Sequence, residues 1–164
     1  MAVEGAVVPE DRELRALLGQ VHTIAVVGLS SKPNRPSLSV AGYLQEHGYR
    51  IVPVNPRETE VLGEPAYPTL RDIPPDIRVD VVDVFRRAEE TPEVARDAVA
   101  IGAKVLWLQE DIVSEEAAAI ATDGGLDVIM GVCIRHVREQ LLPTGNSVVV
   151  PPRPWPRGFR SLLR

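Results

Sequence analysis

The sequence contains a single cysteine, Cys133, so no disulfide can form within the chain. Cysteine this scarce is typical of a reducing compartment, and we expect a cytoplasmic protein. Aromatic residues are also few, at 4% of the chain, which argues against a surface that stacks on single-stranded nucleic acid. The formal net charge of -5 argues further against nucleic acid as a partner, because non-specific binding needs a basic surface.

Long apolar runs are missing as well. No stretch approaches the roughly 20 residues that a transmembrane helix needs. Residues 1–14 carry acids and lack a basic segment followed by an apolar one, so they predict no secretory signal peptide. We therefore expect no membrane association. The three histidines do not have the spacing of a metal site, and we expect no metal.

Apolar runs of strand length alternate with helical patterns along most of the chain. The 164 residues, 45% of them hydrophobic, suit one domain with a proper core. Predicted strands cover residues 23–28, 50–54, 79–85, 104–108 and 126–130, and predicted helices cover residues 10–19, 36–47, 89–101, 114–122 and 134–142. The alternation predicts an α/β protein with a Rossmann-like, doubly wound parallel sheet of about five strands in three α/β/α layers, spanning residues 1–142.

Two segments depart from this alternation. Residues 55–76 are rich in proline and glycine and predict a small turn or hairpin around Gly63. Residues 143–164 carry four arginines and no acid, and they include the polyproline-like stretch PPRPWP. We predict a Pro/Arg-rich C-terminal extension outside the domain, able to contact a protein partner. The sequence does not indicate an oligomeric state.

The first strand-to-helix loop, GLSSKPNRPS at residues 28–37, gathers residues suited to phosphate. In open α/β sheets, ligands bind at the carboxyl ends of the strands, where the strand order reverses. Gly28 permits a tight turn, and Ser30 and Ser31 offer hydroxyl groups. Lys32 and Arg35 add positive charge, and the start of the following helix also favours an anion. The alternative interpretation is an ordinary polar loop.

The same loop departs from two nucleotide-binding motifs. A dinucleotide fingerprint would place glycines where Ser30 and Pro33 stand here. The second strand ends in IVPVNP, without the acid that would hold an adenosine ribose. A P-loop is absent from the sequence. An NAD(P)- or FAD-dependent oxidoreductase on a degenerate Rossmann fold therefore stays only as an alternative function.

Several longer motifs occur in a fixed order along the chain. They are VVGLSSKPNRPSLSVAGYLQEHGYRIVPVNP, then GEPAY, VDVVDVFRR, IGAKVLWLQEDI and the region of Cys133, and they run from about Thr23 to Leu142. In these motifs the chain resembles the CoA-binding domain family, small stand-alone proteins similar to the N-terminal domain of the succinyl-CoA synthetase α subunit. The resemblance implies a Rossmann-like fold and coenzyme A, or an acyl-CoA, as the ligand.

The resemblance also implies which residues hold the ligand, all of them at strand ends. Gly28, Ser30 and Ser31 would surround the phosphates. The other implied contacts are Lys32, Arg35 and Ser37 near the phosphates, Asn55 and Pro56 on the adenosine side, Val84, Phe85 and Arg86 at the end of the third strand, and Gln109 and Glu110 after the fourth. Arg87 is a further candidate from its charge. Arg86 and Arg87 could equally be a solvated helix start, and Phe85 a core residue.

One position departs from the family. An Asp-Arg pair usually precedes the cysteine, whereas this chain has Gly131 and Val132 there. The departure leaves three outcomes open. They are weaker binding of CoA, binding of a different derivative, and a ligand-free Rossmann shell that acts through protein contacts.

Few residues suggest catalysis. Cys133 and His136 are three residues apart, and such a pair can form a nucleophile, but cysteines near strand ends are more often buried and inert. Asp80 and Asp83 resemble paired carboxylates, and we expect no acid–base role for them. In the synthetase, a phosphorylated histidine acts from a separate domain, for which this chain is too short. We therefore expect a CoA-binding protein that is not an enzyme.

Overall fold

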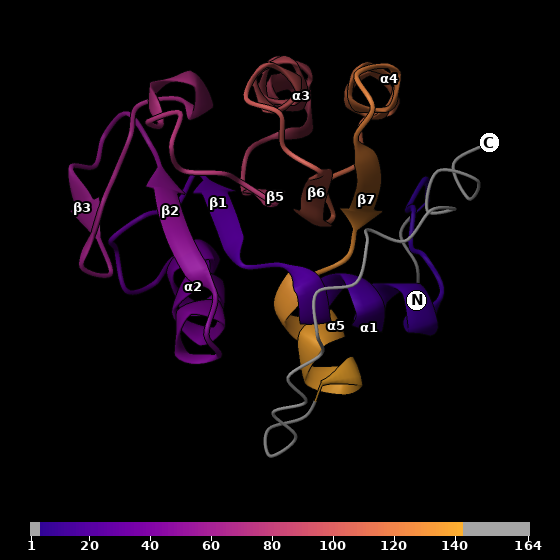
Figure 1. Ribbon diagram of the computed structural model, residues 1–164, viewed down its shortest axis with the longest axis horizontal. Helices are drawn as coiled ribbons and strands as arrows, with labels where there is room; N and C mark the ends of the chain where they lie inside the picture. The colour runs from indigo at the N-terminus through magenta and orange to yellow at the C-terminus, as the bar shows by residue number, and fades with distance from the viewer. Residues whose placement is uncertain (1–3, 143–164) are drawn as a thin grey trace.

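Five parallel strands form one central sheet in the computed structural model, which describes residues 4–142 (Figure 1). The strands are β1 (Thr23–Val27), β2 (Arg50–Val54), β5 (Val81–Val84), β6 (Val105–Glu110) and β7 (Asp127–Gly131), in the spatial order β2-β1-β5-β6-β7. The chain winds from β1 to β2 and then returns to place β5 on the other side of β1. The predicted doubly wound sheet is confirmed, and its switch point lies between β1 and β5.

Helices cover both faces of the sheet and give three layers (Figure 1). One face carries α1 (Asp11–Gln20), α2 (Pro36–Glu46) and α5 (Ile134–Leu141), and the other carries α3 (Thr91–Ala100) and α4 (Glu115–Asp123). Every residue of β1, β5 and β7 is buried. Because both faces are covered, these strands need apolar side chains at consecutive positions, which explains the continuous runs in the sequence. Within the described residues, no helix combines the length and the apolar character needed to cross a bilayer.

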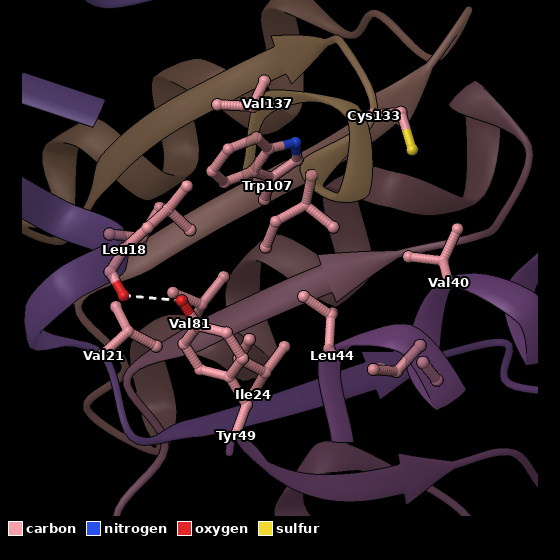
Figure 2. Packing of buried hydrophobic residues seen from close by; sticks show 14 of the residues in the cluster. Leu18, Val21, Ile24, Val40, Leu44, Tyr49, Val81, Trp107, Cys133 and Val137 are labelled. Carbon is pink, nitrogen blue, oxygen red and sulfur yellow. Dashed lines mark hydrogen bonds between the residues drawn. The ribbon is translucent and has the colours of Figure 1, made fainter. Parts of the chain in front are cut away.

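The core beneath α1, α2 and α5 is built around Trp107 (Figure 2). Trp107 is fully buried, and its indole Nε1 donates to the main-chain oxygen of Val132 at 2.8 Å. The Tyr49 hydroxyl donates to the main-chain oxygen of Leu18 at 2.6 Å, the dashed line in Figure 2. These bonds satisfy the polar atoms of two large buried side chains. They also join β6 to the segment before α5, and the start of β2 to α1.

A two-stranded hairpin follows β2 and confirms the turn predicted around Gly63. Its strands are β3 (Glu60–Val61) and β4 (Glu64–Pro65). Tyr67 then pairs with Val54, so the chain after the hairpin lies beside the carboxyl end of β2. Two short 3₁₀ turns, η1 (Leu70–Asp72) and η2 (Ala88–Glu90), flank β5 in the sequence. The predicted extension at residues 143–164 lies outside the described residues.

Candidate functional site

The carboxyl ends of β1 and β5 meet at Gly28. This residue has a φ of +86°, which glycine adopts without strain. Its N–H donates to the Val54 carbonyl oxygen at 2.8 Å, and the Phe85 N–H donates to the Val27 carbonyl oxygen at 2.8 Å. A Cβ at position 28 would lie 2.4 Å from the Phe85 carbonyl oxygen, so no other residue fits unless the backbone moves. Gly28 therefore lets the chain turn out of the sheet at the switch point.

The loop between Gly28 and α2 is held by its own serines. The Ser30 N–H donates to Ser37 Oγ at 3.1 Å, and the Lys32 N–H donates to Ser30 Oγ at 3.2 Å. The N-cap of α2 is Arg35, whose side chain makes no capping hydrogen bond, and Pro36 opens the first turn. The positive end of the helix dipole therefore has no capping side chain, which favours an anion at this point.

A cavity of about 720 Å³ opens over this loop. Its size falls within the range of roughly 300–1,000 Å³ that is typical of small-molecule sites. It is lined by Gly28, Ser30, Lys32, Arg35, Pro36, Ser37, Asn55, Arg57, Glu58, Phe85, Arg86, Arg87, Glu90 and Ile112. Five of these are cations and two are acids, an excess of three positive charges. In a protein whose formal net charge is -5, this concentration of cations indicates a site for an anion.

Glu58 reaches the loop from the segment that follows β2. The Ser31 N–H and the Ser31 hydroxyl both donate to Glu58 Oε1, each at 2.9 Å. Both bonds lower the pKa of the Glu58 carboxyl from its ordinary value, and the bond from the Ser31 N–H has the larger effect. The positive charge of Lys32 lowers it further. The structure thus holds a carboxylate against the loop that the sequence predicts to bind phosphate.

Asn55 joins the end of β2 to this loop. Its Nδ2 donates to the Leu29 carbonyl oxygen at 3.1 Å, and its Oδ1 accepts from the Arg57 N–H at 3.0 Å. The second bond is an Asx turn, which bends the chain immediately after the strand. This bend brings Arg57 and Glu58 to the cavity, so Asn55 positions two of its walls relative to each other.

A smaller cavity of about 350 Å³ adjoins the first. Arg86 and Glu90 line both, so the two cavities form one groove along the carboxyl ends of β2, β1 and β5. The smaller cavity combines apolar residues with acids, and its other lining residues are Val27, Val54, Pro56, Pro68, Thr69, Leu70, Glu89, Glu93, Val94 and Asp97. The groove is therefore basic at the end near α2 and apolar and acidic at the other.

A third cavity, of about 620 Å³, lies at the amino-terminal ends of the strands, before β5 and β6. Two of the three cations that line it, Arg71 and Lys104, already have acidic partners. Arg71 Nε lies 2.6 Å from Asp97 Oδ1, and Lys104 Nζ lies 3.1 Å from Asp80 Oδ1. Asp80 also accepts from two main-chain N–H groups at the start of β1, so its carboxylate has a structural role. Open α/β sheets bind ligands at the carboxyl ends of their strands, and we place the candidate site there.

Most of the residues implied by the family resemblance line the groove. They are Gly28, Ser30, Lys32, Arg35, Ser37, Asn55, Phe85 and Arg86 in the larger cavity and Pro56 in the smaller one, with the further candidate Arg87. Ser31 contacts the groove through its two bonds to Glu58. Val84 is buried inside the sheet, and Glu110 is exposed at the end of β6. Neither of these two lines the groove.

Gln109 is buried and bonded within the protein. Its Oε1 accepts from the Ile134 N–H at 3.0 Å, and its Nε2 donates to Cys133 Sγ at 3.4 Å. Gln109 thereby binds the first residue of α5 and does not line the groove. Cys133 is buried whereas His136 is exposed on α5, which separates the thiol from the histidine nearest to it in sequence. Residues 4–142 contain no cluster of three or more His, Cys, Asp or Glu suited to a metal ion.

Comparison with known proteins assigns the family. A family model described as "CoA binding domain" matches residues 22–138, which is most of the chain. The protein belongs to the CoA-binding domain family. The match includes the loop at residues 28–37, both cavities of the groove and the segment around Cys133.

Relatives of this CoA-binding domain protein include chains of similar length. YneT of Bacillus subtilis, an uncharacterized protein, is 42% identical over 127 residues, which cover 77% of this chain and 93% of YneT. A hypothetical protein from Pyrococcus horikoshii, whose structure is solved, matches with a TM-score of 0.80 and 38% identity, covering 87% of this chain and 96% of that one.

A longer relative is an enzyme. The ADP-forming acetate–CoA ligase II of Archaeoglobus fulgidus is 29% identical over 96 residues. The match covers 57% of this chain and 14% of the ligase. The CoA-binding domain protein therefore corresponds to a small part of that ligase.

Gly131 has little room for a side chain in this CoA-binding domain protein. Gly131 has a φ of +86°, and a Cβ there would lie 2.9 Å from Ala6 Cβ. The segment that contains Ala6 is held in place by Val7, which forms an antiparallel bridge with Met130. The N-terminal segment thus fills the space that a side chain at position 131 would need.

The sequence reasoning missed Arg57, Glu58 and Glu90 as groove residues. The second strand ends without an acid, and Glu58 lies four residues beyond Val54. The signal that could have found it is the Asn55-Pro56 pair, because an Asx turn there reverses the chain toward the switch point. Glu90 lies in η2, between β5 and α3, where the sequence predicts only the start of a helix.

Proposed function

We propose that this protein binds coenzyme A, or an acyl-CoA, in the groove at the carboxyl ends of β2, β1 and β5, without catalysing a reaction. The observation that carries the proposal is the gathering of Lys32, Arg35, Arg57, Arg86 and Arg87 beside the start of α2. CoA carries a 3′-phosphate and a pyrophosphate, so a site for it needs several cations. Membership of the CoA-binding domain family supports the same ligand.

The two ends of the groove suit the two ends of the ligand's nucleotide. The phosphates belong at the basic end, against Ser30, Arg35 and the uncapped start of α2. The adenine belongs near Pro56 in the smaller cavity, where apolar surface can pack on the ring and acids can accept hydrogen bonds from its amino group. Phe85, half-buried in the lining of the larger cavity, offers a face for the adenine or the pantetheine arm.

A screen of adenine-containing ligands tests the proposal. Thermal unfolding is followed with CoA, acetyl-CoA, NAD, NADP and FAD. A ligand present at 100 times its Kd stabilises the fold by about 2.7 kcal/mol. We expect this shift with CoA and little with NAD. A shift with NAD and none with CoA would overturn the proposal in favour of the oxidoreductase, and no shift with any ligand would favour the ligand-free shell.

The variant Arg35→Ala tests whether the ligand binds at the loop of residues 28–37. Loss of one charge-assisted contact to phosphate should weaken CoA binding by about 10- to 100-fold. Arg12→Ala is the matched control, because Arg12 is an exposed cation on α1 that does not line the groove. Isothermal titration calorimetry measures both variants. Equal affinity for CoA in Arg35→Ala and the wild type would move the ligand away from this loop.

The absence of catalysis is tested separately. The thiol of Cys133 is buried and bonded to Gln109, which makes it a poor nucleophile. Acetyl-CoA incubated with the protein should be recovered intact by mass spectrometry. Hydrolysis or acyl transfer that depends on the protein would contradict this part of the proposal.

A further inference from the structure

Both donors of Ser31 are already occupied by a residue of the protein itself. The Ser31 N–H and hydroxyl donate to one oxygen of Glu58, each at 2.9 Å. Ser31 lies in the loop between β1 and α2, and Glu58 lies 27 residues later, beyond β2. The contact therefore joins two separate segments across the basic end of the groove.

A carboxylate in this position has the chemistry of the ligand it faces. Carboxylate and phosphate oxygens are alternative acceptors for the same N–H and O–H donors. Two anions cannot share two donors at hydrogen-bond distance, because their charges repel each other. A phosphate that binds to Ser31 must therefore displace Glu58.

The charged groups around Glu58 are mostly cations, which attract the Glu58 carboxylate and a ligand phosphate alike. Lys32, which lies next to Ser31 in the loop, stabilises the Glu58 carboxylate through its positive charge. The other cations that line the cavity are Arg35 at the start of α2, Arg57 beside Glu58, and Arg86 and Arg87 after β5, and the other acid is Glu90. Glu58 is held by Ser31 alone among the hydrogen bonds found for its side chain in residues 4–142. Its side chain is therefore free to swing away once Ser31 is taken by another acceptor.

We infer that Glu58 is an internal competitor for phosphate, which holds the Ser31 donors in the empty site and leaves them when a ligand phosphate arrives. The inference rests on the proposed function, since it concerns the same groove. Displacement of Glu58 then costs every phosphate ligand a similar amount of binding free energy. A ligand with several phosphates gains contacts with Arg35 and Arg86 that compensate for displacing Glu58, and a ligand with a single phosphate gains fewer.

Removal of the carboxylate tests the competition. Glu58→Ala should bind CoA and inorganic pyrophosphate about 10-fold more tightly than the wild type, because neither has to displace an anion. Inorganic phosphate should gain a similar factor and so become detectable. Glu60→Ala is the control, since Glu60 is an exposed acid on β3, two residues away, that does not line the groove. Isothermal titration calorimetry at pH 7.5 measures all three probes.

The Ser31 amide distinguishes displacement from simple charge repulsion. In the free protein its ¹H–¹⁵N resonance should shift as acid protonates Glu58, at a pKa below that of an ordinary glutamate. In protein saturated with pyrophosphate this dependence on Glu58 should vanish. A Ser31 amide that still follows Glu58 in the bound state would mean that Glu58 stays in place, and would overturn the inference.

The outcomes separate the inference from the proposed function. If Glu58→Ala binds CoA with the same affinity as the wild type, or with a lower affinity, the inference is overturned and CoA remains the ligand. A gain for pyrophosphate without any CoA binding would support the competitor and overturn CoA. If neither protein binds CoA or pyrophosphate, both ideas are wrong.

Discussion

Two strand-to-helix connections of this fold begin with a glycine of the same φ but have different surroundings. Gly28 after β1 and Gly131 at the end of β7 both have a φ of +86°. Each leads to a helix on the same face of the sheet, α2 or α5. The first connection opens onto the groove, and the second packs against the N-terminal segment.

The difference lies in which groups take the donors at each helix start. At α5 the protein supplies a partner, because Gln109 Oε1 accepts from the Ile134 N–H. At α2 the N-cap side chain makes no capping hydrogen bond, and five cations line the cavity at this point. A helix start at the carboxyl edge of a sheet is therefore an anion site only where the protein leaves its donors to a ligand.

Gly28→Ala should be the most damaging change at either connection. Positive φ costs about 1 kcal/mol, and a clash with main chain adds about 1–3 kcal/mol, so the free energy of unfolding should fall by about 2–4 kcal/mol. CoA binding should be lost as well. Gly48→Ala is the control, because Gly48 has a similar φ of 93° and open space around its Cβ position. Urea denaturation measures both, and equal losses would mean that the Phe85 carbonyl moves aside easily.

β5 runs between the two connections and carries a buried acid. Asp83 is fully buried, and neither of its carboxyl oxygens has a hydrogen-bond partner among the described residues. Burial raises the pKa of this carboxyl well above its ordinary value, because the charged form cannot be solvated. The native protein therefore keeps this proton at a pH where the unfolded chain has lost it.

Asp83→Asn should remove a pH dependence of stability. Since the native state binds the proton more tightly, the wild-type free energy of unfolding falls above about pH 4, by up to about 1.4 kcal/mol per pH unit until the native pKa is reached. The variant has no carboxyl to ionise, so its stability should lack this decline, and the stability difference should move in favour of the variant as the pH rises from about 4. Urea denaturation across this range measures the difference, and a difference that stays constant with pH would contradict the assignment.

The fold could be predicted because its signals are local. Strands covered on both faces appear as continuous apolar runs, such as residues 23–27 and 127–131. Helix starts carry their own marks, as at Ser114, whose Oγ accepts from the Ala117 N–H at 3.1 Å and caps α4. Each signal depends on a few neighbouring residues, so a single sequence contains it.

The site was harder to predict because its contacts are not local. Gln109 lies near the end of β6, where the register shifts between Leu108 and Glu110, so simple alternation does not tell which way its side chain points. Glu58 meets Ser31 only because the turn at Asn55 folds back onto a loop 27 residues earlier. Which side chains form hydrogen bonds across the groove therefore depends on the fold as a whole.

Gly131→Ala should cost less than Gly28→Ala because its neighbour can move. The new Cβ would meet Ala6 Cβ, a side-chain atom in the N-terminal segment, rather than buried main chain. We expect a loss of about 1–2 kcal/mol in the free energy of unfolding, with CoA binding retained. Calorimetry and urea denaturation measure the two quantities.

The double variant Ala6→Gly, Gly131→Ala separates the contact from the backbone cost. Removal of the Ala6 methyl group should recover about 0.5–1 kcal/mol beyond the sum of the single changes, because the two residues touch. The rest of the loss should persist, since alanine still has to adopt a positive φ. Strict additivity would mean that backbone conformation alone excludes a side chain at position 131. The N-terminal segment would then cover this connection without determining its sequence.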